Sequence, residues 1–269
     1  MAEEQYDWAS LGIDVTKPSI ARTYDVVLRG KDNFEVDRAF VAEIVKIIPE
    51  IYDVATYNRE ILGRGVRYLA AEAGLRQYLD LGSGLPTVQN THQVAQSVSP
   101  GSRVVYVDND PIVLAHGRAL LAENASTTVV TADIREPEKI LAHEEVRRLI
   151  DFGEPVAVML VGILHHLHDD EGPQQIVETL MEAVPSGSHL FVTAFCRSSQ
   201  EAADAEVQYQ GLLGTGRFRT PEEITRYFDG LELLEPGLVP LPLWRPEEDV
   251  PDELTVGQRL MYGGIARKP

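Results

Sequence analysis

The sequence predicts a doubly wound α/β fold built on a mostly parallel sheet of seven strands. Three observations support this prediction: apolar runs alternate with helical patterns after about residue 75, an apolar run at 78–81 leads into a G-x-G turn at 82–84, and 44% of the 269 residues are hydrophobic. Alternating strands and helices form right-handed βαβ units with parallel strands. A chain of this length and composition can bury the core that such a sheet needs.

Five predicted strands are almost continuously apolar, which is typical of strands buried on both faces of a parallel sheet. They span residues 77–81, 103–108, 127–131, 156–164 and 188–195. Helical patterns separate them at residues 86–97, 111–122, 138–150 and 172–183. Pro86 stands at the first position of its predicted helix, where the missing N–H is harmless.

The end of the chain departs from this alternation. Thr220, Pro221 and Glu223 form a capping box that predicts a helix through Phe228. Two strand candidates follow at 231–239 and 259–266, joined by a Pro-rich, acidic segment. Because no crossover helix connects them, they must pair antiparallel if they are neighbours. We therefore expect a C-terminal antiparallel strand pair.

The first 74 residues have a helical pattern. Val36, Phe40, Ile44 and Ile47 share one helical face, and a second amphipathic segment ends at Gly74. These helices have no strands of their own to cover, so we expect them on the edge or mouth of the sheet. The predicted organisation is an N-terminal helical cap at 1–74 and a core at 75–269.

Composition weighs against several classes of partner. The chain has 24 basic and 42 acidic residues, a net charge of −18, which weighs against nucleic-acid and membrane partners and favours a small molecule. No run of about 18 apolar residues predicts a membrane span, and the acidic N-terminus does not resemble a secretory signal. The single cysteine, Cys196, agrees with a reducing compartment. We expect a cytoplasmic protein, and the sequence does not indicate its oligomeric state.

The first strand ends in the run Asp80-Leu81-Gly82-Ser83-Gly84. Glycines reach backbone angles that are closed to other residues, and they let a ligand approach the main chain. A strand that breaks into such a turn is the nucleotide-binding corner of a Rossmann-like sheet. The third small residue of a dinucleotide fingerprint is missing, because Thr87 occupies its position.

Two more acids follow the next strands of the predicted sheet. Asp108 ends the second strand and Asp133 follows the third, so all three strand-end acids should converge on one crevice. A carboxylate in the position of Asp108 can accept hydrogen bonds from the ribose hydroxyls of a nucleoside. Asp110 is the better candidate to cap the following helix, which leaves Asp108 available for a ligand.

With these motifs the chain resembles the class I S-adenosylmethionine-dependent methyltransferases. The resemblance also includes Asn109 after Asp108 and the run Gly162-Ile163-Leu164-His165-His166-Leu167 after the fourth strand. It implies S-adenosylmethionine as cofactor, with Gly82 and Gly84 at the methionine moiety, Asp108 at the ribose, and Asp133 with Ile134 at the adenine. The cofactor-binding candidates that it adds are Asp80, Ser83, Asn109 and Gly162.

The N-terminal segment is similar to that of an actinobacterial methyltransferase family of largely unknown substrate. The similarity lies in residues 19–38, which contain Gly30-Lys31-Asp32-Asn33-Phe34, and in Asn58-Arg59; Arg29 stands where a glycine is usual. Methyl transfer requires alignment of the reacting groups and exclusion of water, which a polar helical lid can supply. One hypothesis is that Arg22, Tyr24, Lys31 and Asn33 face the crevice and hold cofactor or acceptor. The alternative is that they tie the helices together.

Three histidines follow the fourth strand. A metal site at His165, His166 and His168 is not expected, because adjacent residues at a strand end point in different directions and the spacing matches no zinc pattern. His165 or His166 is a candidate general base near the acceptor, since imidazole titrates near neutral pH. The alternative is that they pack under the adenosine. Tyr24 is the third catalytic candidate.

The sequence thus predicts an S-adenosylmethionine-dependent methyltransferase that acts on an unidentified, small-molecule acceptor. An NAD(P)-dependent oxidoreductase is one alternative, disfavoured by the missing third glycine, by Asp80 ahead of the turn and by the terminal strand pair. A non-catalytic S-adenosylmethionine-binding protein is the other, because a fold does not by itself prove turnover.

Overall fold

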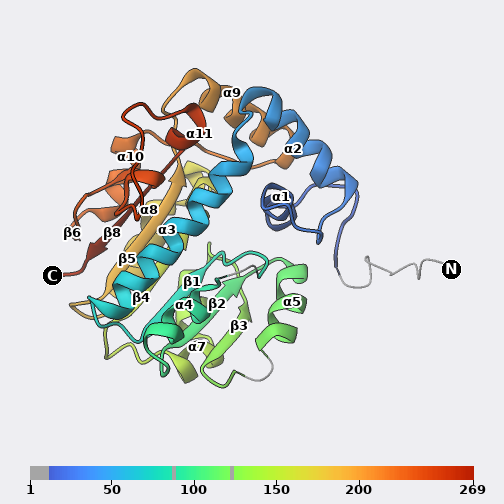
Figure 1. Cartoon of the computed structure of the whole chain (residues 1–269). Helices are drawn as coiled ribbons and strands as arrows, with labels where there is room; N and C mark the ends of the chain where they lie inside the picture. Colours follow the sequence, from blue (N-terminus) through green and yellow to red (C-terminus); the bar gives the residue numbers. More distant parts are fainter. Residues whose placement is uncertain (1–11, 87–88, 122–123) are drawn as a thin grey trace.

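The computed structural model describes residues 12–86, 89–121 and 124–269, and its centre is one twisted sheet (Figure 1). The strands lie in the order β3-β2-β1-β4-β5-β8-β6, and β7 also pairs with β8. The strands are β1 (Gln77–Leu81), β2 (Arg103–Asp108), β3 (Thr127–Thr131), β4 (Ala157–Val161), β5 (His189–Phe195), β6 (Glu232–Leu233), β7 (Val239–Pro240) and β8 (Met261–Arg267). Strands β1 to β5 are parallel, and β8 runs antiparallel to β5, β6 and β7. The doubly wound α/β prediction is confirmed.

Within the part of the chain that the structure describes, the sheet has eight strands, so the prediction of seven is wrong by one. The segment predicted as one strand at 231–239 forms the two short strands β6 and β7, which pair with different parts of β8. Pro236, which has no N–H to donate to a strand ladder, and Gly237, with φ of 92°, lie between them. Strand β4 stops at Val161 rather than at residue 164, because Gly162 turns the chain with φ of 79°.

The helices agree less well with the prediction than the strands do. Their bounds are α1 (Ile20–Val27), α2 (Glu35–Ile47), α3 (Ile51–Ala71), α4 (Thr91–Val98), α5 (Pro111–Leu121), α6 (Pro137–Ala142), α7 (Glu144–Leu149), α8 (Pro173–Glu182), α9 (Gln200–Gln208), α10 (Pro221–Thr225) and α11 (Val256–Arg259). Single turns η2 (Leu164–His166), η3 (Asp169–Glu171), η5 (Arg226–Phe228) and η6 (Leu241–Leu243) and a π-helical turn η4 (Tyr209–Leu213) complete the list.

Three helix predictions need correction. Helix α4 begins at Thr91 behind the cap residue Asn90, so Pro86 is not its first residue; Thr87 lies outside the described residues. The helix predicted at 138–150 is two helices, because His143 leaves the helical conformation and caps α7 by accepting a hydrogen bond from the Glu145 N–H. Helix α9 was not predicted. The capping box at Thr220 and Glu223 is confirmed.

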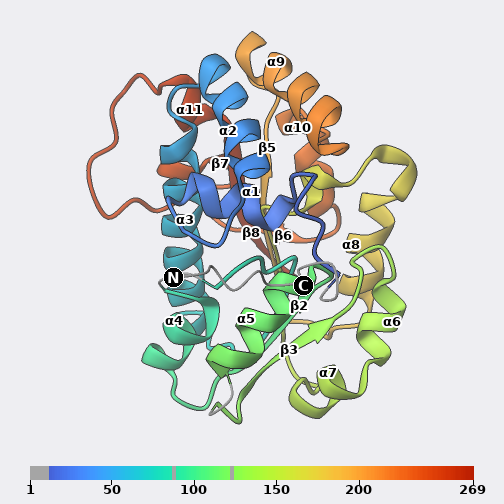
Figure 2. The ribbon, with the colours of Figure 1, turned by 90° about the vertical axis from the view of Figure 1, so that its right-hand side faces the viewer.

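Helices cover both faces of the sheet (Figure 2). Val104, Met159 and Phe191 face one side and share a core with α2, α3 and α4. Val105, Val158 and Leu190, their neighbours in the strands, face the other side and share a core with α6, α7, α8 and α10. This alternation follows from the two-residue period of a strand. Within the described ranges, no helix is long and apolar enough to cross a bilayer.

Helix α3 is part of this layered body, which differs from the expected position at the edge or mouth. A Cβ added to Gly65 of α3 would lie 2.5 Å from Cε1 of Phe191 in β5, so the helix lies directly on the sheet. The predicted boundary at residue 74 falls in the turn after α3, where Gly74 has φ of 72°. Of the three N-terminal helices, α1 and α2 lie beyond the strand ends, and α1 sits between α2 and α5 (Figure 1).

A small third core joins the N-terminal segment to the glycine corner. Phe34 packs there against buried residues of the N-terminal segment, of the turn after β1 and of the first turn of α5. These residues are Ile13, Ala21, Leu85, Ile112 and Val113. The segment that precedes α2 is therefore fixed to the carboxyl ends of β1 and β2.

Candidate functional site

A cavity of about 610 Å³ opens at the carboxyl ends of the parallel strands, beneath α1 and α2. This volume lies in the range of ligand pockets, roughly 300 to 1,000 Å³. Thirteen of the predicted site residues line it: Arg22, Tyr24, Asp80, Gly82, Ser83, Gly84, Asp108, Asn109, Asp133, Ile134, Gly162, His165 and His166. Lys31 and Asn33 are not among the described residues that line it, and their role at the crevice stays a prediction.

The two glycines of the corner have different surroundings. Gly82 has φ of 70°, and its N–H donates to the carbonyl of Val107 at 2.8 Å. A Cβ on Gly82 would lie 2.5 Å from Cγ1 of Ile163, so no side chain fits there. Gly84 has φ of 66°, and a Cβ there would meet no atom within 4 Å. The main chain at Gly84 is thus open to the cavity.

Asp108 joins the end of β2 to the glycine corner. Its Oδ2 accepts a hydrogen bond from the N–H of Gly84 at 2.9 Å, and its Oδ1 accepts one from the N–H of Asp110 at 2.9 Å. Burial raises the pKa of this carboxyl. Asp110 accepts from the N–H of Ile112 at 3.0 Å, which confirms its capping role. Each Asp108 oxygen retains acceptor capacity for a ligand hydroxyl.

Asp80 is the most buried of the strand-end acids and is 6% exposed. Its Oδ2 accepts a hydrogen bond from the Thr91 hydroxyl at 2.7 Å, which ties β1 to the start of α4. Burial raises the pKa of Asp80 to about 6, although Thr91 and the nearby Arg59 favour its ionised form. The cavity therefore has at its floor a carboxyl that titrates near neutrality.

Asp133 is already engaged by a neighbour on its own loop. Its carboxylate accepts hydrogen bonds from Nε and Nη2 of Arg135, at 2.9 and 2.6 Å. These bonds lower the pKa of Asp133. Arg135 also contacts Glu171 at 2.8 Å, so the ion-paired group bridges the loops after β3 and β4.

The polar residues of the N-terminal segment mostly bind one another. Nε of Arg22 pairs with Asp37 at 2.8 Å, and both side chains are almost fully buried. Asn33 donates to Asp25 at 2.8 Å and accepts from Arg38 at 2.8 Å. For Arg22 and Asn33 the structure favours the alternative in which these residues tie the helices together.

Tyr24 belongs to a hydrogen-bonded chain that crosses three elements. The Thr193 hydroxyl of β5 donates to Oδ1 of Asn58 in α3 at 2.7 Å, and Nδ2 of Asn58 donates to the Tyr24 hydroxyl of α1 at 3.1 Å. A Cβ on Gly162 would lie 3.2 Å from the same Nδ2. Asn58 lines the cavity, yet sequence reasoning did not select it, because a lone asparagine within a helical pattern has no chemical signature.

Of the two candidate histidines, His165 is buried and His166 is half-buried. Nδ1 of His165 accepts from the N–H of Phe195 at 3.3 Å, and burial holds the pKa of His165 well below its usual value. Nδ1 of His166 is buried with no hydrogen-bond partner, and burial lowers the pKa of His166 to about 3. In the described part of the chain, no group of three or more His, Cys, Asp or Glu residues could hold a metal ion.

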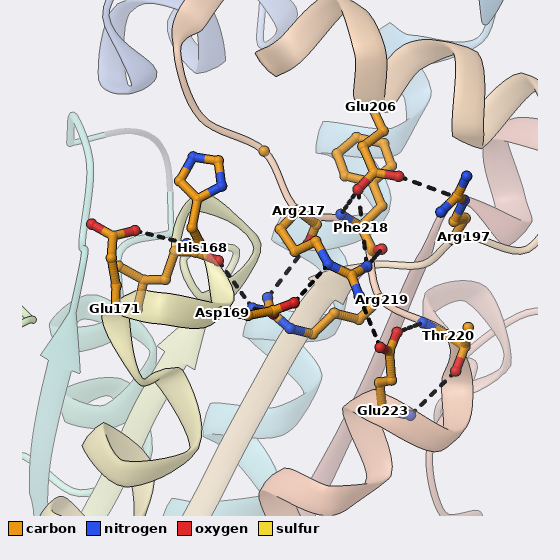
Figure 3. Close-up of polar contacts among 12 residues, drawn as sticks. His168, Asp169, Glu171, Arg197, Glu206, Arg217, Phe218, Arg219, Thr220 and Glu223 are labelled. Carbon is orange, nitrogen blue, oxygen red and sulfur yellow. Dashed lines mark hydrogen bonds and ion pairs between the residues drawn. The ribbon is translucent and has the colours of Figure 1, made fainter.

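A buried arginine supports the loop that carries these histidines (Figure 3). Arg219 donates to the carbonyls of Leu164 and Leu167, at 3.0 Å each, and to Asp169 at 2.9 Å. Around it, Arg217 pairs with Asp169 and Glu223 at 3.2 and 2.9 Å. The sequence did not reveal this network, because its members lie about 50 residues apart.

The far end of the cavity, beneath α2 and α9, is apolar. We call it the apolar chamber. Its lining residues come from α2, the first half of α3, the ends of β5 and β8, and η4: Phe40, Val41, Ile44, Ile51, Val54, Ala55, Phe195, Tyr209, Leu213 and Met261. The ring of His166 lies close to this chamber, because its centroid is 6.4 Å from that of the Tyr209 ring.

Known proteins share both the sequence pattern and the fold. The S-adenosyl methyltransferase family model matches residues 6–269. A crystal structure from Thermobifida fusca, described provisionally as a methyltransferase, is 52% identical, with a TM-score of 0.94 over 98% of this chain and 99% of that one. A DUF574 family protein from Streptomyces avermitilis is 39% identical, with a TM-score of 0.91 over 95% and 99% of the two chains.

More distant similarity extends to other methyltransferases. An O-methyltransferase family protein from Burkholderia thailandensis is 13% identical, with a TM-score of 0.55 over 97% of this chain and 66% of that one, which shows the fold alone. A comparison with curated proteins gave no match. The family match over nearly the whole length decides against the oxidoreductase alternative. The chain belongs to the S-adenosyl methyltransferase family and is an S-adenosylmethionine-dependent methyltransferase.

Proposed function

We propose that S-adenosylmethionine binds along the strand-end acids of this cavity and that a small-molecule acceptor reaches it from the apolar chamber. The observation that carries the proposal is the contact between Asp108 and the N–H of Gly84, because it joins an acceptor for ribose hydroxyls to the open main chain of the corner. The cofactor ribose would lie on Asp108 and Asn109, and the adenine against Ile134 beside Asp133. The methionine moiety would follow Gly82, Ser83 and Gly84 toward Asp80.

The residues present fit such a nucleoside. Asp108 has lone pairs left after its two backbone contacts, and the space beside Gly84 is open. Ile134 supplies an apolar surface, and it packs on the core beneath the sheet. Asp133 reaches an adenine amino group only with the oxygen lone pairs that Arg135 leaves free. The pocket is thus built from the ordinary parts of a nucleoside site.

The chain has the groups that methyl transfer requires. When bound, S-adenosylmethionine supplies an electrophilic methyl group on a sulfonium. Residues of α1 and α2 line the cavity, and Asn58 donates a hydrogen bond that holds the Tyr24 hydroxyl in place at the cavity wall. Gly162 brings the main chain after β4 close to the side-chain amide of Asn58. These residues orient the reacting groups, which is the main demand of an in-line displacement.

A small acceptor fits the charge of the chain better than a nucleic acid does. The net charge of −18 repels phosphate backbones. The cavity has a volume of about 610 Å³, which suits a small molecule. We therefore propose a small-molecule acceptor.

Calorimetry with S-adenosylhomocysteine tests the cofactor site. We expect the wild-type protein to bind it, and Asp108→Asn to weaken binding about tenfold or more, because a carboxylate that accepts two hydroxyl hydrogen bonds is worth roughly 1.5 to 3 kcal/mol. An analogue without the two ribose hydroxyls should bind both proteins equally weakly. Asp151→Asn, an exposed change before β4, is the matched control. No binding by the wild-type protein at millimolar ligand would refute the proposal.

A further inference from the structure

The apolar chamber contains no charged side chain among the described residues that line it. Everything that α2, β5 and β8 contribute to the cavity is apolar, and so are the first three lining residues of α3. The charged lining residues come from the segment before α1 and its first turn, from Arg59 one turn after Ala55 on α3, from the ends of β1 and β2, and from the loops after β2, β3 and β4. A charged acceptor placed in the chamber would lose its hydration with no ionic partner, which is costly.

Aromatic rings shape this chamber. The ring of Tyr209 lies edge-on to Phe40 at 5.0 Å and to Phe195 at 5.4 Å, measured between ring centroids. The rings come from α2, β5 and η4, so three separate elements hold them in a fixed arrangement. Walls of this kind favour flat, polarisable molecules, because aromatic pairs gain energy beyond the area that they bury.

His166 presents a polar group to this cavity. The ring of His166 lines the cavity, and its Nδ1 is buried without a hydrogen-bond partner. Nε2 is therefore the nitrogen left to meet a bound molecule. A second proton would put an N–H at Nδ1 with no acceptor, so the imidazole stays neutral and forms one hydrogen bond through Nε2. The low pKa of His166 has the same cause.

We propose that the methyl acceptor is an uncharged, largely aromatic small molecule that lies in the apolar chamber and hydrogen-bonds through a hydroxyl group to Nε2 of His166. This inference rests on the proposed function, since it takes the cofactor to lie along the strand-end acids. The methyl group replaces the hydroxyl proton: the bond from carbon to sulfur breaks as the bond from oxygen to carbon forms, and the proton leaves to water. His166 orients the hydroxyl and does not store its proton.

Calorimetry with three probes tests the class of acceptor on protein saturated with S-adenosylhomocysteine. We expect 2-naphthol to bind and 2-naphthoate to bind at least about tenfold more weakly at pH 8, because its carboxylate would be buried without a partner. Ala55→Leu, which fills the chamber from α3, should weaken 2-naphthol binding about tenfold or more and leave S-adenosylhomocysteine binding unchanged. Ala71→Leu, an exposed change on the same helix, is the control and should alter neither.

A second pair of variants tests the contact with His166. His166→Leu removes the hydrogen bond and should weaken 2-naphthol binding about threefold to tenfold, whereas naphthalene, which has no hydroxyl, should bind equally to both proteins. His166→Gln retains a polar group near the position of Nε2 and should restore most of the affinity for 2-naphthol.

Three results would overturn the inference: 2-naphthoate binding as tightly as 2-naphthol, 2-naphthol binding that Ala55→Leu does not change, or no 2-naphthol binding by protein that does bind S-adenosylhomocysteine. None of these three results would contradict the cofactor site of the proposed function. If S-adenosylhomocysteine itself does not bind, the proposed function fails. Titration of 2-naphthol into the unliganded wild type and Ala55→Leu then still decides whether the chamber binds neutral aromatic molecules.

Discussion

Nδ2 of Asn58 lies 3.1 Å from the Tyr24 hydroxyl, and this contact joins helix α3 on the sheet to helix α1 above the strand ends. The same amide accepts a hydrogen bond from Thr193 of β5. The side chain of Asn58 therefore links the position of α1 over the cavity to β5, the strand that carries Phe195.

Asn58→Leu should destabilise the protein by about 1 to 3 kcal/mol, because the buried Thr193 hydroxyl loses its partner. Adding Thr193→Val should recover part of this loss, since no unpaired hydroxyl then remains. Urea unfolding of the two single variants and the double variant gives the coupling energy. Independent, additive effects would show that the Asn58 contact is not a structural link.

Asp80→Asn should stabilise the protein above pH 6 and have no such effect below pH 4. Burial raises the folded pKa of Asp80 to about 6 from 3.8, so the folded state holds the proton more tightly than the unfolded state. The stability that this group contributes is complete below pH 3.8 and is lost as the pH rises through 6. The difference should reach about 1 to 3 kcal/mol at pH 7.5.

Thermal unfolding of wild type and Asp80→Asn at pH 4, 5.5 and 7.5 measures this effect, with Asp151→Asn as the exposed control. A gain that is the same at all three pH values would contradict the assignment of the raised pKa to Asp80. We expect the same variant to bind S-adenosylhomocysteine more weakly, since Asp80 lies on the cavity floor.

Gly82→Ala should be more destabilising than Gly84→Ala. Both positions have positive φ, which costs an alanine roughly 1 kcal/mol or more. Only at Gly82 does the new methyl group also meet Ile163, at 2.5 Å. Ile163→Ala should therefore rescue part of the Gly82→Ala loss and none of the Gly84→Ala loss in guanidinium unfolding. Equal losses of stability in Gly82→Ala and Gly84→Ala would show that the positive φ alone causes the destabilisation.

Arg219→Met should cost about 2 to 4 kcal/mol of stability, because it leaves the carbonyls of Leu164 and Leu167 without their donor in a buried site. Its salt bridge with the largely exposed Asp169 should contribute little of this. Arg197→Met removes a half-exposed partner of Glu206 and should cost less than about 1 kcal/mol. NMR of the His166 ring protons should show line broadening in Arg219→Met and not in Arg197→Met. Unchanged spectra in Arg219→Met would show that Arg219 does not support the loop that carries His166.

The sequence was most informative where neighbours along the chain decide the structure. Strands β1, β2 and β3 have the predicted bounds, because each apolar run stops at a polar residue or glycine that turns the chain. The strand-end acids were found because parallel strands present their carboxyl ends together. Helix α9 was missed, because its buried residues are Ala202, Ala205 and Glu206, which give no apolar period. Asn58 and Arg219 were missed because contacts with distant segments define their roles.

The small core around Phe34 has a thermodynamic consequence for the whole site. Phe34 and Ile13 pack on Leu85, which follows the glycine corner, and on Ile112, which follows Asp110. Docking of the N-terminal segment and formation of the nucleoside corner therefore share the same buried surface. Two equilibria that share a surface are linked, and the linkage is reciprocal. A ligand that stabilises the nucleoside corner also stabilises the docked N-terminal segment, and docking of the segment stabilises the ligand-bound corner by the same free energy.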